Sequence, residues 1–195
     1  MPKHGLEIAR SLAYVHAQGQ AHRDVKSANV LLASGAGGLS AKLCDWGSAA
    51  ALLRSLPVRP RPSAWPNLFG GPPASWTPVG TLLWMAPEML EPHFEGSPPP
   101  PGASGATADV FSLGIVLWEL LERKLPWAGG ALGDLKRPQL VNAVVRQGKR
   151  LPLPKWAAPG LRAIIQECWA ADCRKRPTAA QVVARLEELQ ARGRP

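Results

Sequence analysis

Hydrophobic residues recur every three or four positions over much of this chain, and this spacing predicts a mainly helical protein. The first such stretch covers residues 6–18, and Gly19 follows at the position where helices commonly end. Residues 109–124 are apolar around most of a helix, which is typical of a buried helix. Thr178 is placed to cap the last of three further helical patterns, which cover 139–147, 160–171 and 178–191.

Two short apolar runs, residues 30–32 and 41–44, flank a glycine-rich stretch at 35–38 and predict a β-hairpin. A glycine-rich stretch can also cradle a phosphate group, but no helix N-terminus follows this one, so a hairpin turn is the favoured interpretation. The whole pattern therefore predicts a mainly α fold, a helical bundle with one short β-hairpin.

Proline interrupts the pattern in two segments, and we expect both to be flexible insertions. Residues 48–79 contain seven prolines, and residues 92–107 include the run Pro98 to Pro101. Either segment could dock an SH3-like partner through polyproline II geometry. A passive loop is the favoured interpretation.

Composition adds limits on partners and location. The 195-residue chain carries a net charge of +9, and residues 136–195 hold all of the excess, with thirteen Lys and Arg against four Asp and Glu. These basic residues scatter over several helices, so we expect a solvated surface rather than a nucleic-acid site, with acidic partners left open. We expect no membrane span, because no run approaches about 20 apolar residues. Cys44, Cys168 and Cys173 fit free thiols in the cytoplasm.

Residues 22–31, His-Arg-Asp-Val-Lys-Ser-Ala-Asn-Val-Leu, carry the strongest chemical signal. They place a carboxylate (Asp24), a cation (Lys26) and an amide (Asn29) at fixed offsets before an apolar run. Phosphoryl transfer needs such a set, because a carboxylate orients the attacking hydroxyl, a cation neutralises the γ-phosphate, and oxygen ligands hold magnesium.

The segment resembles the catalytic loop of eukaryotic protein kinases, His-Arg-Asp-x-Lys-x-x-Asn. Further motifs of that family follow in order, and the spellings Trp-Met-Ala-Pro-Glu and Cys-Trp look most like the tyrosine-kinase-like group of Ser/Thr kinases. The matching stretches are Asp45-Trp46-Gly47, Gly80 to Glu88, Asp109 to Gly114, Cys168-Trp169 and Arg174 to Thr178.

The resemblance implies ATP and Mg²⁺ as cofactors and a protein substrate with Ser or Thr hydroxyls. Asp24 would be the catalytic base or orienting group, and Lys26 would face the γ-phosphate. Asn29 and Asp45 would hold the magnesium ion. The remaining implied contacts are that Leu31 packs beneath the adenine, that Cys44 adjoins the nucleotide just before Asp45, and that Thr81 bridges Asp24 and Lys26.

Other residues are implied to hold the site together. Arg23 would receive a phosphate from the activation segment. The rings of His22 and Trp46 would stack, although the family has Phe where this chain has Trp46. The resemblance further implies a buried ion pair between Glu88 and Arg176, and hydrogen bonds from the catalytic-loop backbone to Asp109.

Only 21 residues precede His22, and they contain no Gly-rich loop, strand Lys or helix Glu that would grip ATP phosphates. We therefore expect residues 1–195 to form a partial kinase domain, the C-terminal lobe without the small β-rich N-terminal lobe. Two functions stay open: a Ser/Thr protein kinase that is inactive as this chain alone, or a non-catalytic kinase-like lobe that binds proteins.

Overall fold

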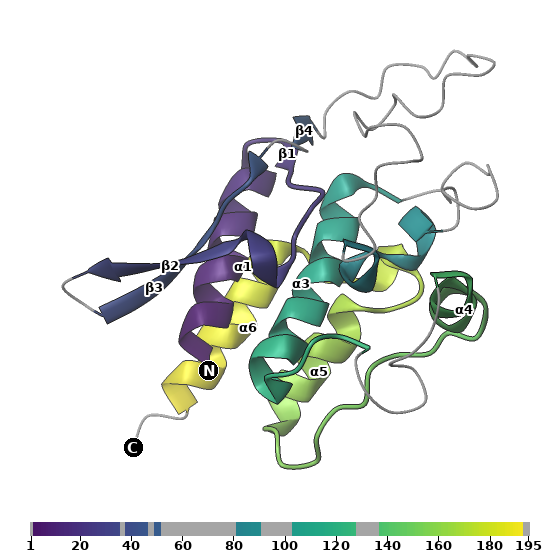
Figure 1. The fold of residues 1–195 in the computed structure, drawn as a ribbon. Helices are drawn as coiled ribbons and strands as arrows, with labels where there is room; N and C mark the ends of the chain where they lie inside the picture. Colours follow the sequence, from purple (N-terminus) through teal and green to yellow (C-terminus); the bar gives the residue numbers. More distant parts are fainter. Residues whose placement is uncertain are drawn as a thin grey trace.

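The computed structural model describes residues 2–35, 38–46, 49–51, 81–90, 103–127 and 137–192, and these are mainly helical (Figure 1). The α-helices are α1 (Pro2–Ala17), α3 (Gly105–Glu122), α4 (Arg137–Val141), α5 (Pro159–Cys168) and α6 (Ala179–Arg192). The strands are β1 (Gln20–Ala21), β2 (Val30–Gly35), β3 (Gly38–Leu43) and β4 (Ala50–Ala51), paired as β1 with β4 and β2 with β3. This architecture confirms the predicted mainly α class with a short hairpin.

Helix α3 runs through the centre of the fold and is buried on most sides, as its sequence predicts. It begins at Gly105 rather than at Asp109, because Ser104 caps it and exchanges hydrogen bonds with Thr107 in a capping box. The last three residues of the segment expected to be a loop over 92–107 are therefore helical. Arg123, in the left-handed conformation at φ 54°, ends the helix.

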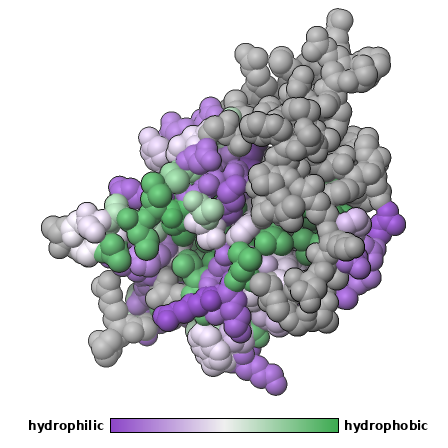
Figure 2. Space-filling view, in the orientation of Figure 1, coloured by the Kyte–Doolittle hydropathy of each residue, from purple (hydrophilic) through white to green (hydrophobic). Residues whose placement is uncertain are grey.

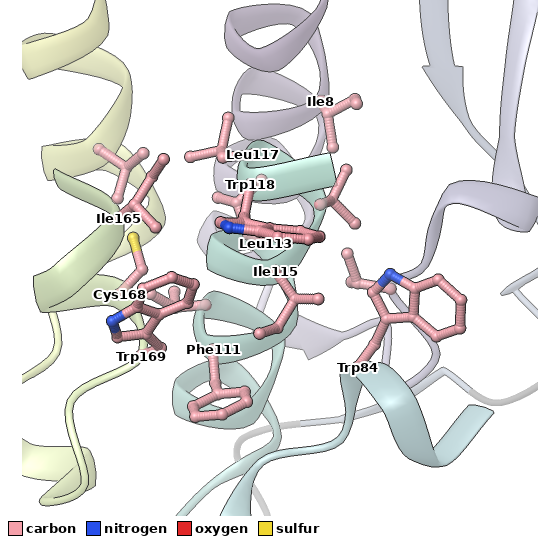
Figure 3. Packing of buried hydrophobic residues seen from close by; sticks show 14 of the residues in the cluster. Ile8, Trp84, Phe111, Leu113, Ile115, Leu117, Trp118, Ile165, Cys168 and Trp169 are labelled. Atoms are coloured by element: carbon pink, nitrogen blue, oxygen red, sulfur yellow. The ribbon is translucent and has the colours of Figure 1, made fainter. Parts of the chain in front are cut away.

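The core is formed where α3 meets α1 on one side and α5 on the other (Figures 1 and 3). Gly114 of α3 allows the close approach to α5, since a Cβ built on it would lie 2.8 Å from the Cβ of Cys168. Helix α6 packs along α1, and the β-hairpin lies across α1. The labelled side chains in Figure 3 converge between these helices and include Ile8, Phe111, Leu113, Leu117 and Ile165.

The predicted hairpin is present as β2 and β3, an antiparallel pair in register from Val30 opposite Leu43 to Gly35 opposite Gly38. Gly38 has a φ of +87°, a conformation that glycine adopts without strain at a tight turn. Figure 2 shows hydrophobic residues gathered on the surface over this hairpin, where Leu31 and Leu32 are more than half exposed.

The C-terminal elements follow the predicted pattern with one difference. Helix α4 gives way after Val141 to a π-helical turn over Asn142–Arg146, so the helix expected over 139–147 is not a single regular one. Helix α6 begins as predicted, because the backbone N–H of Gln181 donates to Thr178 Oγ1 at 3.2 Å.

Much of the two proline-rich segments lies outside the described residues. The first was expected to be flexible over 48–79, but its residues 50–51 form β4, which pairs with β1. Residues 52–80 and 91–102 are not described, and they contain the prolines considered for SH3-like docking. Among the described residues, no helix is long and apolar enough to cross a membrane.

Candidate active site

The loop between β1 and β2 carries the predicted catalytic residues, and a buried carboxylate on α3 holds its backbone. Asp109 is 1% exposed and accepts hydrogen bonds from the N–H groups of His22 and Arg23, each at 2.7 Å. His16 of α1 lies 2.9 Å from the same carboxylate. Arg23 has a φ of 68°, which non-glycine residues rarely adopt, and the bond to Asp109 stabilises this turn. Burial lowers the pKa of the Arg23 guanidinium, while Asp109 acts in the opposite direction.

Asp24, Lys26 and Asn29 form one hydrogen-bonded cluster. Lys26 Nζ donates to Asp24 Oδ2 at 2.6 Å, and Asn29 Nδ2 donates to the same oxygen at 3.0 Å and to the Asp24 carbonyl at 2.8 Å. Asp24 Oδ1 is buried and has no hydrogen-bond partner within the described residues. The cluster therefore fixes the orientation of the carboxylate and leaves one of its oxygens able to accept a hydrogen bond.

Asn29 directly precedes β2 and Asp45 follows β3, so both lie at the same end of the hairpin. The Cys44 N–H donates to the Asn29 carbonyl at 2.8 Å, directly after the paired residues Val30 and Leu43. The Cys44 thiol also contacts this carbonyl, with a sulfur to oxygen distance of 3.1 Å. Asp45 follows with a φ of 63° and is exposed.

This end of the hairpin fits a magnesium ion by the chemistry of its donors. Within the described part of the chain, no group of three or more His, Cys, Asp or Glu could hold a metal. Mg²⁺ does not need such a group, because it is usually bound by one or two carboxylates with water and phosphate oxygens. Asp45 supplies a carboxylate, and Asn29, whose Nδ2 is bound to Asp24, keeps its amide oxygen as a donor.

His22 joins the catalytic loop to the segment around Asp45. Its Nδ1 accepts from the Asp24 N–H at 3.3 Å, so Nε2 carries the proton and donates to the Cys44 carbonyl at 2.9 Å. The imidazole is fully buried, and its centroid lies 4.4 Å from that of the Trp46 ring, with the planes tilted by 58°. The two rings predicted to stack are thus in contact, in a tilted arrangement.

Two other predicted residues sit at the edges of this site. Leu31 lies on β2 and is 59% exposed, so its side chain is available as an apolar floor next to the Asn29 end of the hairpin. Thr81 begins a 3-10 turn, Thr81–Trp84, but its side chain lies outside the part of the chain that is described.

The ion pair expected between Glu88 and Arg176 is present and almost fully buried. The two guanidinium nitrogens donate to the two carboxylate oxygens at 2.5 and 2.8 Å, and the side chains are 4% and 0% exposed. Arg176 also donates to the carbonyls of Ala170 and Thr107, at 2.9 and 3.0 Å. The pair therefore joins residues 81–90 to the helical core.

Glu119 is a site residue that sequence reasoning missed. It lies on α3 and accepts hydrogen bonds from Trp84 Nε1 at 2.6 Å and from Ser27 Oγ at 3.0 Å. Burial raises the pKa of the Glu119 carboxyl, and the two donors oppose that shift. The signal was available, since Glu119 is the first acidic residue after Asp109 in an otherwise apolar stretch of helix. It connects the catalytic loop to the Thr81–Trp84 turn.

The sequence of this chain is similar to the sequences of known proteins. The protein kinase domain family matches residues 3–186. The chain is 32% identical over 185 residues to the serine/threonine/tyrosine-protein kinase HT1 of Arabidopsis thaliana. This alignment covers 94% of this chain and 38% of the relative. It is 31% identical over 185 residues to the Arabidopsis serine/threonine-protein kinase CTR1, covering 94% of this chain and 18% of the relative.

A third relative, the probable serine/threonine-protein kinase SIS8 of Arabidopsis, is 32% identical over 189 residues, which is 95% of this chain and 15% of the relative. The chain thus spans well under half the length of these relatives. The family match over most of the chain agrees with the order of the motifs along it. The chain belongs to the protein kinase family, within the tyrosine-kinase-like group of Ser/Thr kinases.

Proposed function

We propose that this chain forms the C-terminal lobe of a Ser/Thr protein kinase domain, which transfers the γ-phosphoryl group of ATP to Ser or Thr hydroxyls of protein substrates. One observation carries the proposal. Asp24 is held by Lys26 and Asn29 through one carboxylate oxygen, while the other is buried and accepts no hydrogen bond from the described residues. A substrate hydroxyl is the donor that this oxygen fits.

Asp24 acts mainly by position. Its Oδ1 accepts the proton of the attacking hydroxyl and orients the hydroxyl oxygen, and such positioning can supply much of the rate acceleration. Lys26, whose ammonium lies 2.6 Å from Asp24 Oδ2, places a cation beside the same hydroxyl to stabilise the transferring phosphate. Mg-ATP, when bound, supplies the phosphoryl group and the neutralising metal charge.

Further residues bind and surround the cofactors in this proposal. Asn29 and Asp45, at the shared end of the hairpin, hold Mg²⁺ through their oxygens. The exposed Leu31 side chain would pack against the adenine, and Cys44, which precedes Asp45, would lie next to the nucleotide. Thr81 organises the substrate side of the site, and Arg23 receives an activating phosphate.

The test compares radiolabelled phosphate transfer from Mg-ATP to a Ser/Thr-rich protein such as casein. It uses the protein expressed from its complete reading frame, with and without Asp24→Asn. We expect the variant to lose at least about a hundredfold in kcat, because an amide cannot accept the proton. Glu187→Gln, which alters an exposed ion pair between α6 and Arg10 of α1 and changes none of the predicted site residues, serves as the control and keeps full activity. Equal turnover by wild type and Asp24→Asn would refute the role of Asp24.

The assignment to a single lobe has its own test. The 195-residue chain by itself should show no turnover in the same assay, because the Gly-rich loop, strand Lys and helix Glu of a small lobe would not be there to hold the ATP phosphates. Turnover that Asp24→Asn abolishes in this chain alone would overturn that part of the proposal.

A second candidate function, a kinase-like lobe that binds proteins without catalysis, is favoured by one observation. Leu31, Leu32 and Trp46, on and beside the hairpin, are 59%, 58% and 41% exposed, and the consecutive Leu31 and Leu32 place apolar side chains on both faces of β2. Exposed apolar patches often mark binding surfaces. If the complete protein transfers no phosphate and neither ATP nor Mg²⁺ raises its melting temperature, this second function replaces the first.

A further inference from the structure

The segment from α4 to the middle of α5 differs in charge from the rest of the chain. Residues 137–166 contain no Asp or Glu, and their six basic residues are Arg137, Arg146, Lys149, Arg150, Lys155 and Arg162. Charges of one sign raise the local concentration of oppositely charged partners, and they do so most strongly where no nearby acid neutralises them. Within the sequence of this segment, no acidic residue offsets these positive charges.

Elsewhere in the fold, basic side chains are commonly neutralised by a neighbouring acid. Arg10 pairs with Glu187, Arg174 with Asp172, and Arg185 with Glu167. By contrast, the charged groups of Lys149, Lys155 and Arg162 make no ion pair with any residue that the structure describes. Their charges are thus available to an outside partner.

The same segment carries an exposed aromatic side chain. Trp156 is 73% exposed, more than any other large hydrophobic side chain among the described residues, and it follows Lys155 directly. Tryptophan and arginine are the residue types that contribute most to binding energy at protein interfaces. Exposure of a tryptophan next to unpaired cations therefore points to a contact surface.

Residues on both sides of Trp156 in the sequence line a pocket. Leu151, Leu153 and Trp169 supply apolar lining, and Arg150 and Arg162 supply two guanidinium groups. Arg150 is held rigidly, because its Nε donates to the Trp169 carbonyl at 2.8 Å and its Nη1 to the Val144 carbonyl at 3.1 Å. Burial lowers the pKa of the Arg150 guanidinium, the nearby Arg176 charge adds to this effect, and the Glu88 carboxylate opposes it. A carboxylate in the pocket would lie beside the guanidinium groups of Arg150 and Arg162.

We propose that Trp156, Lys149, Lys155, Arg162 and this pocket, all within residues 144–169, form a docking surface for an acidic segment of a protein partner. The segment carries an apolar side chain flanked by Asp or Glu. The apolar side chain enters the pocket against Leu151 and Leu153, and the carboxylates pair with the basic side chains. The surface does not include Asp24, Lys26, Asn29 or Asp45, so docking does not depend on phosphoryl transfer.

A peptide fits this surface better than a nucleic acid does. Single-stranded nucleic acids bind along grooves where several aromatic side chains stack successive bases. Within the described part of residues 137–166, Trp156 is the one aromatic residue. The pocket offers a peptide both kinds of contact, since Leu151 and Leu153 suit an apolar side chain, and Arg150 and Arg162 suit a carboxylate.

The experiment measures fluorescence anisotropy of a labelled twelve-residue peptide, rich in Glu and with one central Phe, titrated with the 195-residue chain. Three variants are compared: Trp156→Ala, Arg162→Glu, and Arg192→Glu as the matched control. Arg162 lies in the first turns of α5, where a negative charge is favourable to the helix, so the charge reversal should leave the fold intact. Arg192 is an exposed arginine at the end of α6 and lies outside the surface. Circular dichroism confirms that each variant is folded.

We expect Trp156→Ala and Arg162→Glu each to weaken binding at least about tenfold, and Arg192→Glu to change it by less than about twofold. A peptide with Gln in place of Glu, or Gly in place of Phe, should bind at least about tenfold more weakly. Equal binding by all variants, or an equal loss with Arg192→Glu, would overturn the proposal. Tighter binding of a single-stranded RNA of the same length, lost with Trp156→Ala, would replace the peptide with a nucleic acid.

Discussion

Replacing Glu88 by Gln should destabilise the fold more than any exposed charge neutralisation. The substitution keeps the shape of the side chain but removes the negative charge from a pair whose members are 4% and 0% exposed. Gln also offers one oxygen where Arg176 Nη1 and Nη2 now donate to two, at 2.5 and 2.8 Å. The other amide position would bring one donor against another.

The magnitude follows from the burial of the partner that remains. Arg176 keeps its bonds to the Ala170 and Thr107 carbonyls, so it cannot leave for solvent without breaking them. Removing one partner of a buried pair leaves an uncompensated charge and costs about 3–5 kcal/mol. With a urea dependence of about 2 kcal/mol per molar, the unfolding midpoint should fall by roughly 1.5–2.5 M.

Tryptophan fluorescence during urea unfolding measures this loss, since the chain contains eight Trp residues and several are buried. The matched control is Glu187→Gln, which neutralises an ion pair with Arg10 whose side chains are 45% and 57% exposed. An exposed pair contributes about 0–1 kcal/mol, so its midpoint should move by less than about 0.5 M. A double variant, Glu88→Gln with Arg176→Met, should lose less than the sum of the single variants. Similar losses for Glu88→Gln and Glu187→Gln would refute the reasoning.

Three further outcomes follow from other contacts. Burial raises the pKa of Glu119 above its ordinary 4.5, so the stability that the neutral carboxyl provides is complete below pH 4.5 and is lost as the pH rises through the raised value. The stability of Glu119→Gln relative to wild type, measured by urea unfolding, should therefore increase from pH 4.5 upward. A decrease over this range would contradict the reasoning. The hydrogen bonds that Trp84 and Ser27 donate to Glu119 should still stabilise the wild type. Gly114→Ala should lower the free energy of unfolding by about 1–3 kcal/mol, because its Cβ would lie 2.8 Å from the Cβ of Cys168. This loss should outweigh the higher helix propensity of Ala. An unchanged urea midpoint would show that α5 moves away freely. The Cys168 thiol is fully buried with a pKa raised to about 12, so mass spectrometry should find it unalkylated by iodoacetamide at pH 8 until urea unfolds the chain.

The sequence could predict the elements because their signals are local. The apolar circumference of residues 109–124 indicated a buried helix, and α3 is buried on most sides. The glycines around residues 35–38 indicated a turn, and β2 and β3 meet there. The predicted start of α3 was wrong by four residues, because Ser104, which caps the helix, lies within the proline-rich segment 92–107 that was expected to be a loop.

The order and spacing of polar motifs were enough to establish the family and to name Asp24, Lys26, Asn29 and Asp45 as candidates, since such a spacing is a property of the chain itself. Only the folded structure decided which of these side chains meet, because hydrogen bonds between distant segments depend on packing that no local pattern encodes. It placed Asn29 beside Asp24, joined Glu119 to Ser27 and Trp84, and left Trp156 exposed. Burial decides the energetic weight of each contact, and burial arises when helices far apart in sequence pack together.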